Sequence, residues 1–151
     1  MSRLFSSLLA GLALAAVALG QRGADWAEVA RFRPVDVFVD SGTQPLAAYQ
    51  LHFQATAGDV EIVGIEGGEH PAFAEPPYYD PKAIQREQVI LAAFSTVSAD
   101  RLPTGKTRVA TIHFRTAGET APQFEVSAQT AASADGERLT VMVTYEERKT
   151  E

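Results

Sequence analysis

Residues 47–55 read Ala47-Ala48-Tyr49-Gln50-Leu51-His52-Phe53-Gln54-Ala55, and this stretch decides the fold class. Its odd positions carry apolar side chains, and its even positions from residue 50 to residue 54 carry glutamine or histidine. Successive side chains of a β-strand point to opposite faces, so this period of two predicts a strand with one buried and one solvent-facing side. A turn follows at Ala57-Gly58-Asp59.

The same alternation recurs along the chain. It predicts strands over residues 35–40, 60–65, 109–114, 124–128 and 139–145. Residues 88–97 form a near-continuous apolar run, which predicts a strand buried on both faces. Helical periodicity is weak throughout. The sequence therefore predicts an all-β protein, an antiparallel jelly-roll β-sandwich of about eight or nine strands.

The alternation also predicts which side chains form the core, with the reservation that a one-residue slip would invert a face. The predicted core comprises Val35, Val37, Val39, Tyr49, Leu51, Phe53, Ile62, Val89, Leu91, Ala93, Val109, Ile112, Phe114, Val126, Leu139, Val141 and Val143.

The first twenty residues have the pattern of a signal peptide. Arg3 precedes an apolar run over residues 4–19, and Ala18-Leu19-Gly20 offers small residues for cleavage before Gln21. The run would span about 24 Å as a helix, less than the roughly 30 Å hydrocarbon core, although an uncleaved membrane anchor is the alternative. We expect a signal peptide at 1–20, a linker at 21–31, a β-sandwich domain at 32–146 and a polar tail at 147–151. This organisation predicts a secreted, periplasmic or cell-envelope protein.

Composition excludes several functions. The 151 residues contain no cysteine, which excludes thiol nucleophiles, iron–sulfur clusters and disulfides. The net charge of −6 argues against nucleic acid as a partner, because phosphate binding needs a basic surface. Acidic residues are plentiful, but no pattern singles out a catalytic pair, and Ser95 lacks the Gly-x-Ser-x-Gly context of a hydrolase. We therefore expect a non-catalytic protein without a cofactor.

Several stretches resemble a cohesin-type domain, the jelly-roll module of bacterial cellulosome scaffolds. They are Val35 to Val39, Tyr49-Gln50-Leu51-His52-Phe53, Val60-Glu61-Ile62-Val63-Gly64-Ile65-Glu66-Gly67, Val89-Ile90-Leu91-Ala92-Ala93-Phe94, Leu102-Pro103-Thr104-Gly105 and Val109-Ala110-Thr111-Ile112-His113-Phe114. The likeness covers residues 35–145. It departs from the family at Tyr79-Asp80-Pro81, which here follows the valine-rich strand, whereas in cohesins such a motif precedes it. The resemblance implies a non-catalytic module of the carbohydrate-binding-like β-sandwich group.

The loop from Glu66 to about Glu87 is the most informative local feature, because loops this long are usually functional or disordered. Four prolines brace it, and we expect binding residues at His70, Phe73, Tyr78, Tyr79 and Asp80. The alternative is that these aromatic side chains fold back as a lid over one end of the sandwich. The exposed strand faces, by contrast, are expected to lack aromatic and aliphatic anchors.

Tyr78 and Tyr79 are the expected anchors of any interaction. The loop also carries Glu66, Glu69, Glu75 and Asp80, which predicts a neutral or basic partner.

No metal-binding motif is present, although Glu66 and Asp80 together could flank a calcium ion. His52 and His113 lie on polar faces of predicted strands and would form a two-histidine site only if those strands were adjacent.

These patterns leave two functions open. The first is an exported scaffold or adhesion module that binds a protein partner in the manner of a cohesin. The second is a polysaccharide-binding module or an accessory protein of polysaccharide degradation. Membrane contact is expected only if the N-terminal segment stays uncleaved.

Overall fold

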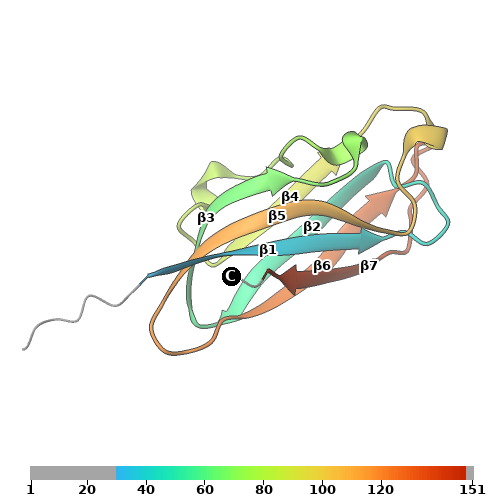
Figure 1. The fold of residues 1–151 in the computed structure, drawn as a ribbon. Coiled ribbons are helices and arrows are strands. Elements are labelled where there is room, and N and C mark those ends of the chain that lie inside the picture. Colours follow the sequence, from blue (N-terminus) through green and yellow to red (C-terminus); the bar gives the residue numbers. More distant parts are fainter. Residues whose placement is uncertain (1–29, 149–151) are drawn as a thin grey trace, which may run out of the picture.

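A computed structural model describes residues 30–148 and shows two antiparallel β-sheets packed face to face (Figure 1). Sheet A has the strand order β3 (Asp59–Gly67), β5 (Lys106–Ala117), β1 (Arg31–Asp40) and β7 (Met142–Glu147). Sheet B has the order β4 (Gln88–Phe94), β2 (Ala48–Ala57) and β6 (Gln123–Ala132). The all-β sandwich predicted from the sequence is confirmed, with seven strands in the described part of the chain in place of the predicted eight or nine.

Every connection passes from one sheet to the other. The odd-numbered strands form sheet A and the even-numbered strands form sheet B, so no two consecutive strands among these seven are neighbours in a sheet. β1 pairs with β5 and β7, and β2 pairs with β4 and β6. This alternation builds the two-sheet antiparallel β-sandwich that the sequence predicts.

The core lies between the two sheets and matches the predicted inward positions. The buried members of the predicted set are Val35, Val37, Val39, Tyr49, Leu51, Phe53, Ile62, Val89, Leu91, Val109, Ile112 and Phe114. Ala93, Val126, Leu139, Val141 and Val143 are only partly buried and pack against that core. The partial exposure of the last three has a structural cause. Leu139 and Val141 precede β7, which begins at Met142, later than predicted, and Val143 lies on β7 itself, an edge strand of sheet A.

The prediction that residues 88–97 are buried on both faces is wrong. β4 is an edge strand of sheet B, and its side chains alternate in burial. Val89 and Leu91 point into the core, whereas Ile90 and Phe94 are among the exposed large hydrophobic side chains. An apolar run thus marks a strand here without marking two buried faces.

The long connection from β3 to β4 folds over one side of the sandwich in two short 3₁₀ turns, η1 (Pro71–Phe73) and η2 (Pro81–Ala83). Each turn begins at a proline, whose fixed φ suits the first helical position, and each is capped by the preceding side chain. A third turn, η3 (Ala99–Arg101), lies between β4 and β5.

The ends of the domain differ from the sequence prediction by a few residues. β1 begins at Arg31, inside the expected linker, and β7 continues through Glu147 into the expected polar tail. The predicted signal peptide and most of the predicted linker lie outside the described residues. Within residues 30–148 no helix has the length and apolar character needed to cross a membrane.

Candidate functional site

The outer face of sheet B carries an exposed apolar patch, defined here as Tyr78, Ile90 and Phe94. Tyr78 forms an isolated antiparallel bridge with Ala92, in which each backbone N–H donates to the other residue's carbonyl. Ile90 and Phe94 stand two residues either side of Ala92 and so share its face. The loop therefore extends sheet B by one residue pair beyond β4 and places Tyr78 beside Phe94.

The apolar patch is strongly solvent-exposed. Tyr78 is 71%, Phe94 63% and Ile90 48% exposed. The rings of Tyr78 and Phe94 stack with centroids 6.2 Å apart and planes 9° apart. The other exposed large hydrophobic residues, Phe32, Val63 and Met142, lie on three different strands of sheet A, namely β1, β3 and β7. Only on sheet B do such side chains gather in the described part of the chain, and grouped apolar exposure is the usual mark of a contact surface.

Polar side chains cover the rest of the outer face of sheet B. Gln50 donates a hydrogen bond to Gln129, and Gln54 donates one to Glu125 over 3.0 Å. The ring of His52 lies 3.2 Å from the side-chain oxygen of Gln88. These cross-strand pairs tie β2 to both of its neighbours and border the apolar patch with amide groups.

A pocket of about 400 Å³ opens beside the apolar patch. We call it the basic pocket, and its polar and patch-facing lining consists of His52, Asp80, Lys82, Arg86, Gln88 and Ile90. Ile90 belongs to both the pocket and the patch, so the two are continuous. Lys82 and Arg86 are exposed, and Asp80 is the only acidic residue in the lining.

The residues predicted to bind from the 66–81 loop are divided between surface and interior. Phe73 is only 3% exposed and packs edge-on against Tyr49, with ring centroids 5.3 Å apart, so its predicted place on a binding surface is wrong. Tyr79 is partly buried against the core. Tyr78 alone among the loop aromatics is exposed, so the lid interpretation holds for Phe73 and the surface interpretation for Tyr78.

The two polar loop residues cap the 3₁₀ turns. Nδ1 of His70 accepts a hydrogen bond from the Ala72 N–H at 3.1 Å, and Oδ1 of Asp80 accepts one from the Lys82 N–H at 2.9 Å. Asp80 also lines the basic pocket, whereas His70 has this local structural role.

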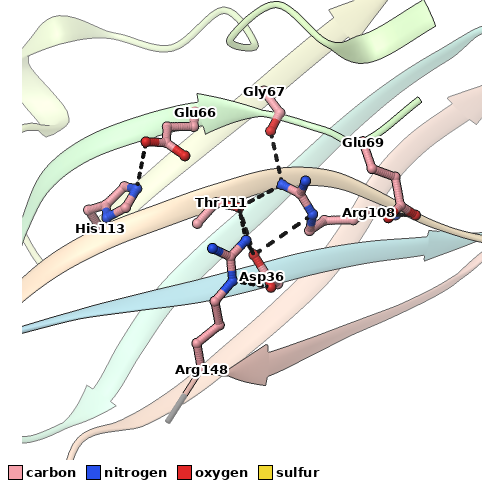
Figure 2. Close-up of polar contacts among 8 residues, drawn as sticks. All are labelled: Asp36, Glu66, Gly67, Glu69, Arg108, Thr111, His113 and Arg148. Atoms are coloured by element: carbon pink, nitrogen blue, oxygen red, sulfur yellow. Dashed lines mark hydrogen bonds and ion pairs between the residues drawn. The ribbon is translucent and has the colours of Figure 1, made fainter. Parts of the chain in front are cut away.

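The proposed calcium pair is not brought together. Glu66 lies on β3 and faces the outer surface of sheet A, where its Oε1 is 3.1 Å from Nε2 of His113 on β5 (Figure 2). Asp80 lies in the basic pocket on sheet B. His52 and His113 are divided in the same way, on β2 and β5 of different sheets. Among residues 30–148 there is no group of three or more histidine, aspartate or glutamate side chains that could hold a metal ion.

Sheet A instead carries a charged cluster that the sequence did not indicate, defined here as Asp36, Arg108, Thr111 and Arg148 (Figure 2). Arg148 donates two hydrogen bonds of 2.7 Å to the two oxygens of Asp36. The Thr111 hydroxyl donates to Asp36 over 2.6 Å and accepts a hydrogen bond of 2.8 Å from Arg108. Arg148 follows β7, so the cluster ties the end of the described chain to the centre of the sheet.

The electrostatics of the charged cluster suit a structural role. Burial alone would raise the pKa of Asp36, but hydrogen bonds from Arg148 and Thr111 and the charges of Arg148 and Arg108 outweigh it and hold the pKa below its ordinary value. An acid with a lowered pKa and with both oxygens already bonded is a poor proton donor at neutral pH. The cluster therefore stabilises the fold.

Glu69 supports the same region from the loop. β1 and β5 change register next to Val37, which leaves Val109 as an extra residue in β5. At this bulge the Glu69 carboxylate accepts the Arg108 N–H and the Glu69 N–H donates to the Arg108 carbonyl, both over 3.0 Å. Glu66 and Glu69 thus face sheet A, so half of the predicted acidic loop surface lies away from Tyr78.

These features define the molecule as a β-sandwich whose described residues carry an exposed apolar patch and an adjoining pocket. The chain matches no protein-family model, and the comparisons with curated proteins and with solved structures give no match. The resemblance to cohesin domains therefore stays a prediction.

Proposed function

We propose that this protein is an exported, non-catalytic binding module that attaches to a protein partner through the outer face of sheet B, as the resemblance to cohesins implies. The observation that carries the proposal is the apolar patch. Two stacked aromatic rings and an isoleucine are exposed together there, whereas the other exposed large hydrophobic side chains of the described residues are divided among three strands of sheet A. Aromatic anchors of this kind dominate the binding energy of protein interfaces.

The position of the patch supports a docking surface. A β-sheet face is held rigid by its backbone ladder, and the bridge from Tyr78 to Ala92 fixes the loop onto that sheet. Side chains that are already ordered lose little entropy when a partner arrives, which favours tight association over a small area.

Polysaccharide binding is the second candidate, and one observation favours it. The amide-bearing side chains of Gln50, Gln54 and Gln88 lie on the face that carries the exposed ring of Phe94. A ring face beside amide donors and acceptors suits a pyranose sugar. Ile90 lies between them and offers no ring, which is why we place a protein partner first.

The test compares the wild-type protein with the double variant Tyr78→Ser/Phe94→Ser. Proteins captured from the secretome of the native host are identified by mass spectrometry, purified and titrated against both forms. We expect the double variant to bind at least tenfold more weakly at an unchanged melting temperature. Thr43→Ala/Thr140→Ala, on exposed positions elsewhere, is the control and should bind normally.

Two results would contradict the proposal. Equal affinity of the wild-type protein and the double variant for a purified partner would remove the apolar patch from the interface. Binding on a glycan array that the double variant loses, with no protein captured, would assign the face to a polysaccharide.

A further inference from the structure

We infer that the partner carries a carboxylate side chain that enters the basic pocket while an apolar side chain about four residues away on the same extended segment covers Tyr78 and Phe94. This inference rests on the proposed function and names the chemistry of the partner segment, an acidic and aromatic or aliphatic peptide. It reverses the neutral or basic partner that the loop sequence predicts.

The two cations of the basic pocket are not neutralised by a neighbouring side chain among residues 30–148. In the described part of the chain, neither the Lys82 ammonium nor the Arg86 guanidinium has an ion-pair or hydrogen-bond partner. The cations on the outer face of sheet A are paired instead, for example Arg148 with Asp36 and Lys106 with Glu146.

The pocket thus has the sign opposite to that of the whole chain. Two cations face a single carboxylate, Asp80, in a protein of net charge −6. Positive charge left open in one pocket of an acidic protein complements an anionic group.

The segment that holds these cations is fixed by its caps and by hydrogen bonds to β3. Asp80 caps the turn that carries Lys82, and Pro81 begins that turn. Gln85 adopts a left-handed backbone conformation with φ of 70°, which is uncommon for a residue other than glycine. Its N–H donates to the Ile62 carbonyl over 2.7 Å, and the Ile62 N–H donates to the Arg86 carbonyl over 2.8 Å. Two hydrogen bonds to β3 therefore hold the backbone of Gln85 and Arg86 beside the pocket, with Gln85 in a conformation that residues other than glycine seldom adopt.

The basic pocket and the stacked rings lie along the same strand, β4. Ile90 borders both the pocket and the apolar patch, and Phe94 lies four residues further along the strand. At about 3.4 Å per residue this separation is about 14 Å, which an extended peptide covers in about four residues. A single extended segment thus reaches both sites. The pocket volume of about 400 Å³ accommodates one acidic side chain with its hydration water.

The test uses three probes on the purified protein, immobilised for biolayer interferometry. They are the random copolymers poly(Glu,Tyr) and poly(Lys,Tyr), which share an aromatic component and differ in charge, and polygalacturonate, an acidic polysaccharide. We expect poly(Glu,Tyr) to bind at the lowest concentration of the three. The variant Lys82→Gln/Arg86→Gln should raise its half-saturation concentration at least tenfold.

The matched control is Arg31→Gln/Arg101→Gln, which removes the same charge from exposed positions outside the pocket. It should change the half-saturation concentration less than twofold. An equal loss of affinity in the control would show that overall charge is responsible and would overturn the inference. Tighter binding of poly(Lys,Tyr) would overturn it as well, and tighter binding of polygalacturonate would assign the pocket to an acidic polysaccharide.

Failure of this inference is separable from failure of the proposed function. With a purified natural partner, loss of binding on Tyr78→Ser/Phe94→Ser but not on Lys82→Gln/Arg86→Gln retains the docking surface and refutes the carboxylate. If neither double variant loses binding, both the docking surface on sheet B and the carboxylate in the basic pocket are refuted.

Discussion

Replacing Arg148 by glutamine tests the charged cluster on sheet A. The change removes two hydrogen bonds of 2.7 Å between charged groups, and each would contribute about 1.5–3 kcal/mol if fully buried. The Arg148 side chain is 47% exposed, so water competes for it, and fully exposed pairs contribute only about 0.2–1 kcal/mol. Because Asp36 is only 9% exposed and the contact is bidentate, we expect an intermediate loss of about 1–2 kcal/mol. For a domain of this size that loss lowers the melting temperature by about 3–10 °C.

The pH dependence of this loss gives the sharper assay. The pKa of Asp36 is lowered in the folded protein from an ordinary value of 3.8, so its stabilisation is fully present above that value. It is lost as the pH falls below 3.8 and through the folded-state pKa, because the unfolded chain binds the proton first. Urea unfolding followed by far-UV circular dichroism should therefore show a difference between wild type and Arg148→Gln at pH 7 that shrinks in acid. The control is Arg33→Gln, since Arg33 lies 4.0 Å from Glu147 in a more exposed pair. If Arg148→Gln costs no more than Arg33→Gln at pH 7, the bidentate contact does not stabilise the fold.

Three further predictions concern the core and its backbone. Leu91→Ala should lower the free energy of unfolding by about 2–5 kcal/mol because Leu91 is fully buried, while Ile90→Ala, on the opposite face of β4, should change it by less than about 1 kcal/mol. Gly67→Ala should prevent the loop from packing on β3, because the added Cβ would lie 2.0 Å from a backbone carbonyl oxygen. Gly64→Ala is the control, since its Cβ meets nothing closer than 3.9 Å, and comparable melting temperatures for the two variants would contradict this geometry. Burial raises the pKa of Tyr49 above its ordinary value of 10, so stability should fall as the pH rises above 10, and Tyr49→Phe should weaken that alkaline fall in urea titrations.

The inward-facing positions were the most predictable part of the fold. Val35, Leu51 and Ile112 each lie in a period-two pattern, and the structure buries all three. Such a pattern requires only that one face of a strand be shielded from solvent, and the alternation that produces it can be read within the strand itself. Strand order carries no comparable local signal. Residues 88–97 therefore read as a central strand, although β4 lies at an edge with Ile90 and Phe94 in solvent.

The candidate site was predicted only in part. Tyr78 was identified from the proline-braced loop, but its neighbour Phe94 was assigned to the interior, so the stacked pair was missed. The alternation of strand side chains does indicate that Phe94 faces outward, since in a strand with Leu91 inward the residues at 90, 92 and 94 must share the other face. The contact between Asp36 and Arg148 could not have been found this way, because the two residues are 112 positions apart and meet only through the pairing of β1 with β7.

The alternation of successive strands between the two sheets also has a consequence for how the chain folds. Because no strand pairs with its immediate successor, no hairpin of these seven can form first and act as a template. Every ladder must close a long loop, and β1 has one edge unpaired until β7, up to Glu147, arrives. Proteins dominated by such distant pairings fold in about milliseconds to seconds, much more slowly than helical bundles. A chain that emerges from a ribosome or a translocation pore in N-to-C order would thus stay incompletely folded until β7 is released. The binding proposed for the outer face of sheet B should therefore appear only after synthesis or export of the whole domain is finished.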